Sequence, residues 1–215
     1  MQTFGKPAAH RHVNEALERP YHHGNLRQAL IDTASEMLRD DKGWQFTLRE
    51  VARRAGVSHA APYKHFPDKA SLLSELAQRG FEQLEAETRA AISPRQRSAR
   101  KAFMAAAQAY VEFGTRNPSL YRLMFSAEAG DAATTHLGAR AMSALGVVIE
   151  LLQRGQASGE FKQRDVRGQA SACWSMVHGI VVLSIEGMLH PRKVGEDPVR
   201  AALETLLEGL EVPVP

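Results

Sequence analysis

Residues 47–66 read TLREVARRAGVSHAAPYKHF, and this stretch decides the fold of the first third of the chain. Thr47 and Glu50 have the T-x-x-E spacing of a capping box, in which each residue bonds the backbone of the other at the start of a helix. Gly56 is placed to end that helix, because glycine adopts the left-handed backbone conformation at little cost. The pattern predicts a short helix between Thr47 and Gly56.

A second short helix is predicted directly after the glycine turn. Ser58 is a favoured cap residue and Pro67 is a breaker, so the expected helix covers the residues between them. Asp68 then caps a longer helix over about residues 71–90, which is the covalent route to the rest of the chain. The segment therefore predicts two short helices joined by a glycine turn, followed by a long helix.

Upstream of this unit, Asn25 precedes an apolar stripe at helical spacing, and Gln28 lies three residues on, where it can complete a capping box. The stripe contains Leu26, Ala29, Leu30, Ala34, Met37 and Leu38. We predict that this helix ends before Gly43. The three capped helices form a small unit, which the long helix completes.

The remaining segments also have helical rather than alternating periodicity. We expect helices over residues 98–115, a short stretch from Asn117-Pro118, and residues 132–157, 165–189 and 197–210. The predicted fold class is all-α, with an N-terminal three-helix helix-turn-helix domain and a helical C-terminal domain. The predicted divisions are a flexible arm over 1–20, the N-terminal domain over 21–70 and the C-terminal domain over 71–215.

The segment 165–189 is apolar on nearly every side, so a helix there must be covered all round. Residues 197–210 carry a further apolar stripe. Both could be ordinary core of a large monomer, but the C-terminal part of a 215-residue chain offers little to cover them. Burial against a two-fold copy is the more economical solution. We predict a homodimer formed through the last two helices.

Composition narrows the class of protein. The chain of 215 residues is 44% hydrophobic with a net charge of +3, which excludes full-length disorder. One cysteine, Cys173, excludes a disulfide framework and fits a reducing compartment. The sequence contains no stretch of about 18 uncharged apolar residues, so no membrane-spanning helix is expected. Residues 1–20 lack the apolar core of a secretory signal. We predict a cytoplasmic protein with no membrane partner.

The positive charge lies near the start of the chain. Residues 42–69 contain six basic and two acidic side chains, and a basic cluster favours polyanions, although a solvated surface explains it equally well. A helix-turn-helix places its second helix in the major groove of DNA. Here that helix begins with small residues, which let the backbone approach base edges, and continues with Tyr63 and Lys64, which can donate to phosphates. The residues therefore predict a DNA-binding unit.

The unit resembles the DNA-binding domain of the TetR family over about residues 25–75. The resemblance rests on FTLREVA at 46–52, AGVS at 55–58, YKHFPDK at 63–69 and Leu72-Leu73. It implies an all-helical homodimer whose N-terminal heads bind a palindromic operator in double-stranded DNA and whose C-terminal bodies bind a small effector. It assigns phosphate contacts to Thr47, Tyr63 and Lys69, and places Ser58, His59, Ala60 and Lys64 nearest the base edges. Pro62 departs from the apolar residue frequent in the family, which leaves the register of the second helix open by one residue.

A second resemblance lies downstream, where NPSLYRLMF at 117–125 and WSMVHG at 174–179 are similar to the WHG type of TetR C-terminal domain. Trp174 and His178 lie four residues apart and share a helix face, as a core pair or as a pocket wall. The resemblance makes Met104, Phe125, Trp174 and His178 the candidates for an effector pocket.

Other chemistries are not favoured. His10, His12, His22 and His23 lack the cysteine or clustered carboxylates of a metal site. Cys173 and His178 lie about 140° apart around a helix, so they do not form a nucleophile and base. We predict no metal, no cofactor and no catalysis. The predicted function is a transcriptional repressor released from its operator by a small molecule; the alternative is an architectural or ligand-binding protein that binds DNA with low specificity.

Overall fold

The structure, a computed structural model, describes residues 26–39, 43–129 and 138–213. Within these ranges the secondary structure is helical, apart from an isolated antiparallel bridge between Phe161 and Glu211. The all-α prediction is therefore confirmed. The predicted arm at 1–20 and the proposed cap at Asn25 lie outside the described residues.

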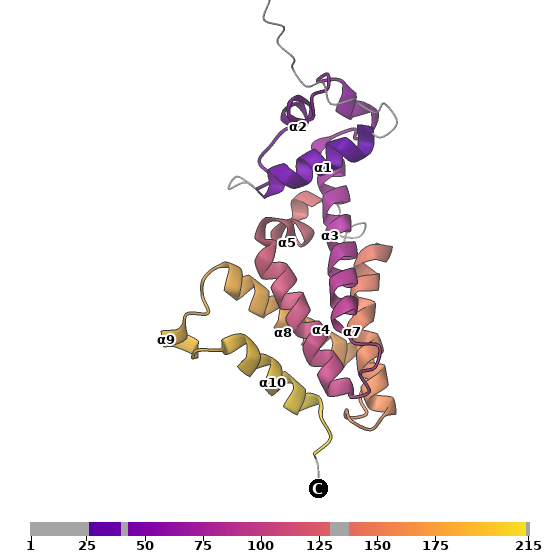
Figure 1. The fold of residues 1–215 in the computed structure, drawn as a ribbon, viewed down its shortest axis with the longest axis vertical. Helices are drawn as coiled ribbons and strands as arrows, with labels where there is room; N and C mark the ends of the chain where they lie inside the picture. The colour runs from indigo at the N-terminus through magenta and orange to yellow at the C-terminus, as the bar shows by residue number, and fades with distance from the viewer. Residues whose placement is uncertain (1–25, 40–42, 130–137, 214–215) are drawn as a thin grey trace, which may run out of the picture.

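The N-terminal helices form a head at one end of the molecule (Figure 1). It contains α1 (Leu26–Leu38), α2 (Leu48–Arg54) and a single 3₁₀ turn, η1 (Ala61–Lys64). The long helix α3 (Lys69–Ala91) begins in the head and continues into the body. The buried side chains that hold these elements together include Leu30, Ile31, Ala34, Phe46, Leu48, Val51, Phe66, Leu72 and Leu76.

The predicted start and end signals of α2 and the start of α3 are confirmed. The backbone N–H of Thr47 donates to Glu50 Oε2 at 2.7 Å and the N–H of Glu50 donates to Thr47 Oγ1 at 3.2 Å, which is a complete capping box. Asp68 forms the same arrangement with Ser71 at the start of α3. Gly56 ends α2 with φ +72°, a conformation that a residue with a Cβ adopts at a cost of about 1–2 kcal/mol.

The predicted helix between Ser58 and Pro67 is wrong in length and in cap. Only Ala61–Lys64 are helical, and the cap position is Ala60, without a side-chain bond from Ser58. Pro62 explains the difference because it has no N–H to donate to the Ser58 carbonyl. The N–H of Ala61 closes a tighter bond to that carbonyl at 3.0 Å instead.

The body contains the remaining helices; the first of them pack along α3, and the last three extend to the left away from it (Figure 1). They are α4 (Ala99–Arg116), α5 (Pro118–Met124), the 3₁₀ turn η2 (Ala127–Ala129), α7 (Ala139–Ala157), α8 (Val166–Ile185), α9 (Pro191–Val194) and α10 (Pro198–Leu210). α3 packs against α4, α5 and α7, and α8 packs against α4 and α7.

Two of the predicted body helices need correction. The predicted helix at 132–157 begins at Ala139 within the described residues. The predicted helix at 165–189 ends at Ile185 instead, where Gly187 takes φ +66° and the N–H of Met188 bonds the Leu183 carbonyl, so the chain leaves the helix before Pro191. Pro191 begins the short helix α9 instead of closing α8.

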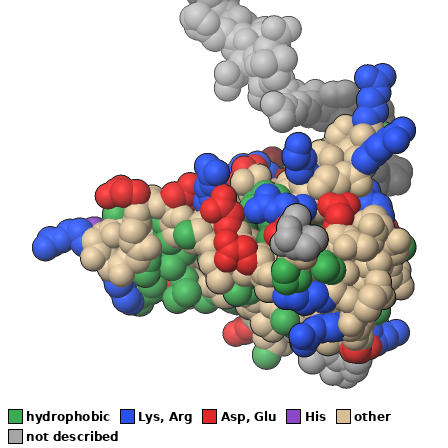
Figure 2. Space-filling view, turned by 90° about the horizontal axis from the view of Figure 1, so that it is seen from below, with side chains coloured by type: hydrophobic (Ala, Val, Ile, Leu, Met, Phe, Trp, Pro, Cys, Tyr) green, Lys and Arg blue, Asp and Glu red, His purple; other side chains and the backbone are tan. Residues whose placement is uncertain are grey.

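One side of α8 is exposed in the single chain, so this chain alone does not provide the cover on all sides that its sequence predicts. Val182 and Leu183 of α8 are exposed, as are Met188 after the end of the helix and Val194 on α9. Figure 2 shows hydrophobic side chains along the part of the body that α8, α9 and α10 form. With 20 residues and a mean hydropathy of 1.3, α8 is the one helix in the described ranges that could cross a membrane by length and composition, a test that core helices of soluble proteins also pass.

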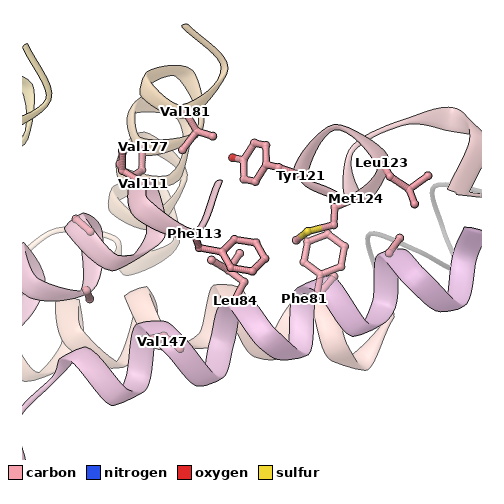
Figure 3. Close-up of a cluster of buried hydrophobic side chains, with 14 of the residues drawn as sticks. Phe81, Leu84, Val111, Phe113, Tyr121, Leu123, Met124, Val147, Val177 and Val181 are labelled. Atoms are coloured by element: carbon pink, nitrogen blue, oxygen red, sulfur yellow. The ribbon is translucent and has the colours of Figure 1, made fainter. Parts of the chain in front are cut away.

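The core of the body is built around close approaches between helices (Figure 3). Phe81 and Leu84 of α3 are buried against α4 and α5, together with Phe113 and Met124. Gly114 lets α4 approach α8, since a Cβ at this position would lie 2.3 Å from Val181 Cγ1.

This contact predicts opposite effects for two glycine substitutions in helices. Gly114→Ala should destabilise the fold by about 1–3 kcal/mol, because the added methyl group forces α4 and α8 apart. Gly146→Ala should stabilise it by up to about 1 kcal/mol, because the Cβ meets nothing within 4 Å and alanine favours the helix. Urea unfolding, monitored by circular dichroism, gives the free energy of unfolding of each variant. Equal effects of the two substitutions would contradict the close approach of α4 and α8.

Candidate nucleic-acid interface and internal cavity

The residues predicted to lie nearest the base edges are all at the surface of the head. Ser58, His59 and Ala60 are exposed in the turn that leads into η1, and Lys64 is exposed at its end. Tyr63 is half exposed, with 50% of its surface accessible. The turn presents these side chains because Pro62 and Phe66 are buried beneath it. The structure thus leaves the predicted residues free to contact a ligand, and their DNA contacts remain predictions.

The other two predicted phosphate contacts are already engaged within the head. The hydroxyl of Thr47 donates to Glu50 Oε2 at 2.9 Å, so it must change partner before it can donate to a phosphate. The ammonium group of Lys69 lies 5.8 Å from the centre of the Phe46 ring, which is within the range of a cation–π contact. Phe46 thereby holds Lys69 at the start of α3.

Arg27 joins the head to α3. Its guanidinium lies 5.2 Å from the centre of the Phe66 ring, directly after the η1 turn, and its Nη2 lies 2.8 Å from Glu75 Oε2. Arg79 bonds Glu75 at 3.0 Å and also donates to the side chain of Gln28 at 2.9 Å. Two α1 side chains therefore fix the orientation of the head on the first turns of α3.

Glu75 extends this contact to the body. Arg140, in the first turn of α7, lies 3.8 Å from Glu75 and 2.8 Å from Glu82. Partial burial raises the pKa of Glu75, but bonds from Arg27 and Arg79 outweigh it and hold the pKa below its ordinary value. Glu75 is thus a carboxylate at neutral pH, shared by α1, α3 and α7.

The body contains an internal cavity of about 280 Å³. It lies among α3, α4, α7 and α8, and Phe125 at the end of α5 closes one side. Its lining side chains are apolar apart from the hydroxyl groups of Thr88 and Tyr110 and the indole N–H of Trp174, and no charged residue lines it. Met142 and Trp174 both line it and are 40% and 41% exposed, which places its mouth between α7 and α8. A cavity of this kind suits a small, apolar molecule.

Two of the four predicted pocket residues line this cavity and two do not. Phe125 and Trp174 are on its wall. Met104 is not, although its helix supplies Phe103 and Ala107 to the wall, because one residue turns a helix by about 100°. His178 instead lines a second hollow of about 230 Å³ with Tyr121, and Phe125 lies between this hollow and the cavity. Whether any of these residues contacts an effector remains a prediction.

A chain of hydrogen bonds joins His178 to the cavity wall. His178 Nδ1 lies 2.7 Å from the hydroxyl of Tyr121, which lies 3.0 Å from the hydroxyl of Tyr110. Trp174 lines the same cavity as Tyr110. Figure 3 shows Tyr121 reaching from α5 toward α8. Burial lowers the pKa of His178 and raises the pKa of both tyrosines, so all three groups are uncharged at neutral pH.

The groups considered for other chemistry stay apart. Cys173 is fully buried, and burial raises the pKa of its thiol to about 12, which removes the thiolate needed for nucleophilic attack. Within residues 26–39, 43–129 and 138–213, no three histidine, cysteine or acidic side chains are grouped to hold a metal. The histidine pairs at His10, His12, His22 and His23 lie outside those ranges.

Sequence reasoning did not find Arg27, Glu75, Arg140 or Tyr110. The i,i+4 spacing of Glu75 and Arg79 gave a local signal for one ion pair. The contact between Arg27 and Glu75 joins residues 48 positions apart, and no periodicity within one helix reports such a contact.

Comparison with known proteins agrees with this architecture. The family described as "Bacterial regulatory proteins, tetR family" matches residues 30–76, and "Tetracyclin repressor-like, C-terminal domain" matches residues 103–210. The nucleoid occlusion factor SlmA of Vibrio cholerae is 30% identical over 101 residues, which are 46% of this chain and 51% of that protein. The chain thus matches about half the length of this curated relative.

Solved structures extend the likeness to nearly the whole chain. A protein of unknown function from Rhodococcus sp. RHA1 is 34% identical with a TM-score of 0.79, covering 91% of this chain and 100% of that one. A bacterial regulatory protein of the tetR family from Rhodococcus RHA1 is 22% identical with a TM-score of 0.65, covering 87% and 97%. Because the C-terminal family alone matches half of the chain and the helix-turn-helix family matches the head, the protein belongs to the TetR family of DNA-binding transcriptional regulators.

Proposed function

We propose that the protein is a cytoplasmic repressor that binds a palindromic operator as a homodimer and leaves it when a small molecule occupies the cavity. The observation that carries this proposal is the exposed turn at Ser58–Lys64, which α3 connects rigidly to a body with an apolar cavity. The predicted division into a head over 21–70 and a body over 71–215 is kept as a proposal, although α3 crosses it without a break.

The head has the parts needed to bind DNA. Ser58, His59 and Ala60 are small or planar and exposed, so the turn can enter the major groove and bring its backbone near base edges. Tyr63 and Lys64 project from the same turn and can donate to phosphates or bases, and Lys69 follows at the start of α3. The single 3₁₀ turn places these groups within a few residues, which favours a short recognition site in each half of the operator.

The exposed face of α8 is the proposed dimer surface. Val182 and Leu183 are exposed on it, and Gly179 and Ser175 lie on the same side one and two turns earlier, where small side chains allow a second helix to approach closely. α10 packs beside α8 and extends the surface. Two copies related by a two-fold axis would cover the apolar side chains and place both heads on one operator.

The ion pairs at Glu75 offer a route from cavity to head. α7 contributes Met142 to the cavity wall. Two residues earlier in the same helix, Arg140 contacts Glu75 of α3. Glu75 holds Arg27, which lies over Phe66, two residues after the exposed turn Ser58–Lys64, the recognition turn of the proposed DNA interface. A ligand that displaces α7 would therefore shift the equilibrium between two positions of the head, provided it binds one position more tightly.

The second candidate is an architectural or ligand-binding protein that binds DNA with low sequence specificity. The comparison with the nucleoid occlusion factor SlmA brings this candidate forward, because that relative is named for a role other than control of an operator. The ratio of specific to non-specific affinity separates the two functions, since specific regulators bind their sites about 10³–10⁷ times more tightly than other DNA.

Selection of bound sequences from random double-stranded DNA tests the main proposal. We expect one inverted repeat whose half-sites are about 34–36 Å apart, or a multiple of this, with a specificity ratio of at least about 10³ at fixed salt. A ratio near one, or enrichment of a single half-site, overturns the proposed operator-binding repressor.

Lys69→Ala should weaken binding to specific and random duplexes alike. Each lost phosphate contact makes the slope of the logarithm of the binding constant against the logarithm of the salt concentration (the salt slope) shallower by about 0.9. A dimer loses two such contacts, so its salt slope should become shallower by about 1.8. Tyr63→Phe should also weaken both duplexes but keep the salt slope, because it removes a hydrogen bond without a charge. Fluorescence anisotropy between 50 and 200 mM salt measures both. Lys101→Ala, an exposed lysine of α4, is the matched control and should change nothing.

Substitutions at the recognition turn should alter base preference instead of overall affinity. His59→Ala and Lys64→Ala are expected to change the selected half-site, because both side chains are exposed on the turn that faces the groove. Repeating the selection with each variant measures the effect. An unchanged motif after both substitutions contradicts their assignment to the base edges.

Leu183→Glu should dissociate the dimer. A charge placed among apolar side chains is costly, and a cost of about 1.4 kcal/mol already weakens association tenfold. Sedimentation equilibrium gives the dissociation constant, and we expect a loss of at least about tenfold. Ala90→Glu adds the same charge at an exposed position of α3 and should leave the dimer intact. A dimer of unchanged stability in the Leu183 variant would place the interface elsewhere.

Glu75→Gln should loosen the head on α3. The glutamine side chain keeps the shape of glutamate but loses the ion pairs with Arg27, Arg79 and Arg140, which together are worth about 1 kcal/mol at partly exposed positions. Amide hydrogen exchange over α1 should then be about fivefold faster, while α8 and α10 stay protected. Glu85→Gln, which removes an ion pair with Arg89 on the same helix, is the control. Unchanged exchange in α1 would show that Glu75 does not hold the head.

A further inference from the structure

The cavity wall selects strongly against charge. Its lining contains no lysine, arginine, histidine, aspartate or glutamate, so a charged group of a ligand would be buried without a partner of opposite sign. Thr88 already donates its hydroxyl hydrogen to the Leu84 carbonyl at 2.7 Å, and the indole of Trp174 has a donor but no acceptor. Among the described lining residues, the Tyr110 hydroxyl is the group that can either donate to a ligand or accept from it.

The size of the cavity limits the molecule it can hold. An apolar protein cavity of about 150 Å³ binds one benzene ring. The volume here is about 280 Å³, so a molecule of about two fused aromatic rings, or an aliphatic chain of similar volume, would fill it. The exposed mouth between Met142 and Trp174 admits a flat ligand from solvent.

The hydrogen-bond chain lets Tyr110 either accept or donate. When His178 Nδ1 carries no hydrogen, Tyr121 donates to it, Tyr110 donates to Tyr121, and the Tyr110 oxygen can only accept from a ligand. When Nδ1 carries the hydrogen, the chain runs the other way and the Tyr110 hydrogen is free for a ligand acceptor. The two orders differ only in which ring nitrogen of a neutral His178 is protonated, so neither brings a charge into the core.

We propose that the cavity binds an uncharged, mainly apolar molecule of about two rings whose single polar oxygen or nitrogen bonds the Tyr110 hydroxyl, with Tyr121 and His178 adjusting the direction of that bond. This ligand class rests on the proposed effector function of the cavity. It follows from three observations on the wall: its apolar lining, its volume and the polar chain that ends at Tyr110.

Equilibrium dialysis of the full-length protein at pH 7 tests the ligand class with three probes of one size. 2-Naphthol is uncharged and has a hydroxyl, naphthalene has no polar group, and 2-naphthoate has a charge. We expect 2-naphthol to bind about fivefold more tightly than naphthalene, as one added hydrogen bond provides, and 2-naphthoate to bind more weakly than both. Binding of 2-naphthoate as tight as that of 2-naphthol overturns the proposal without any variant.

Tyr110→Phe should remove the preference for 2-naphthol while leaving naphthalene binding within twofold. Thr115→Val removes a hydroxyl from an exposed position of the same helix, is the matched control and should retain the preference. Equal weakening of 2-naphthol and naphthalene binding in the Tyr110 variant would show that the hydroxyl only supports the structure, and a retained preference would show that it does not contact the ligand. Both results overturn the assignment of Tyr110.

The same probe separates this inference from the repressor function. Selective binding of 2-naphthol with no effect on affinity for the selected operator supports the ligand class and contradicts the effector response. Release of the operator by 2-naphthoate at least as readily as by 2-naphthol supports an effector response and contradicts the ligand class.

Discussion

The structure depends on one constraint, which is that α3 is a single unbroken helix shared by head and body. Its 23 residues span about 35 Å, and its start is fixed by the bonds between Asp68 and Ser71. The first turns of α3 pack on α1, and the later turns pack on α4, α5 and α7. Because a helix of this kind forms a sharp kink only where its hydrogen bonds are interrupted, a large movement of the head requires movement of α3 against the body.

Local signals made much of the fold predictable. The capping residues Thr47 and Asp68 and the turn residue Gly56 act within a few positions, so the sequence alone located the ends of α2 and the start of α3. Apolar periodicity located the body helices, because each buries one face in the shared core. The recognition turn was the local failure, where the missing N–H of Pro62 outweighed the favourable cap at Ser58.

The site was less predictable because it is assembled from distant parts of the chain. Phe125 and Trp174 line the cavity as expected from the resemblance, but Tyr110, on the same wall, reaches His178 only through Tyr121. Which of two neighbouring residues on α4 faces the cavity, Phe103 or Met104, depends on the rotation of that helix within the body. Such rotations follow from packing between helices, which no single segment encodes.

In the proposed response to a ligand, the length of α3 determines how far the cavity wall has to move. A tilt of about 5° at the body end would move the far end of a 35 Å helix by about 3 Å. In a two-fold dimer the two heads would move in opposite directions, so their separation would change by about 6 Å against the 34–36 Å between successive major grooves. Arg140 and Met142 lie two residues apart on α7, one at Glu75 and the other on the cavity wall. A ligand that shifts α7 slightly therefore acts on the helix whose small tilt has the largest effect on the head.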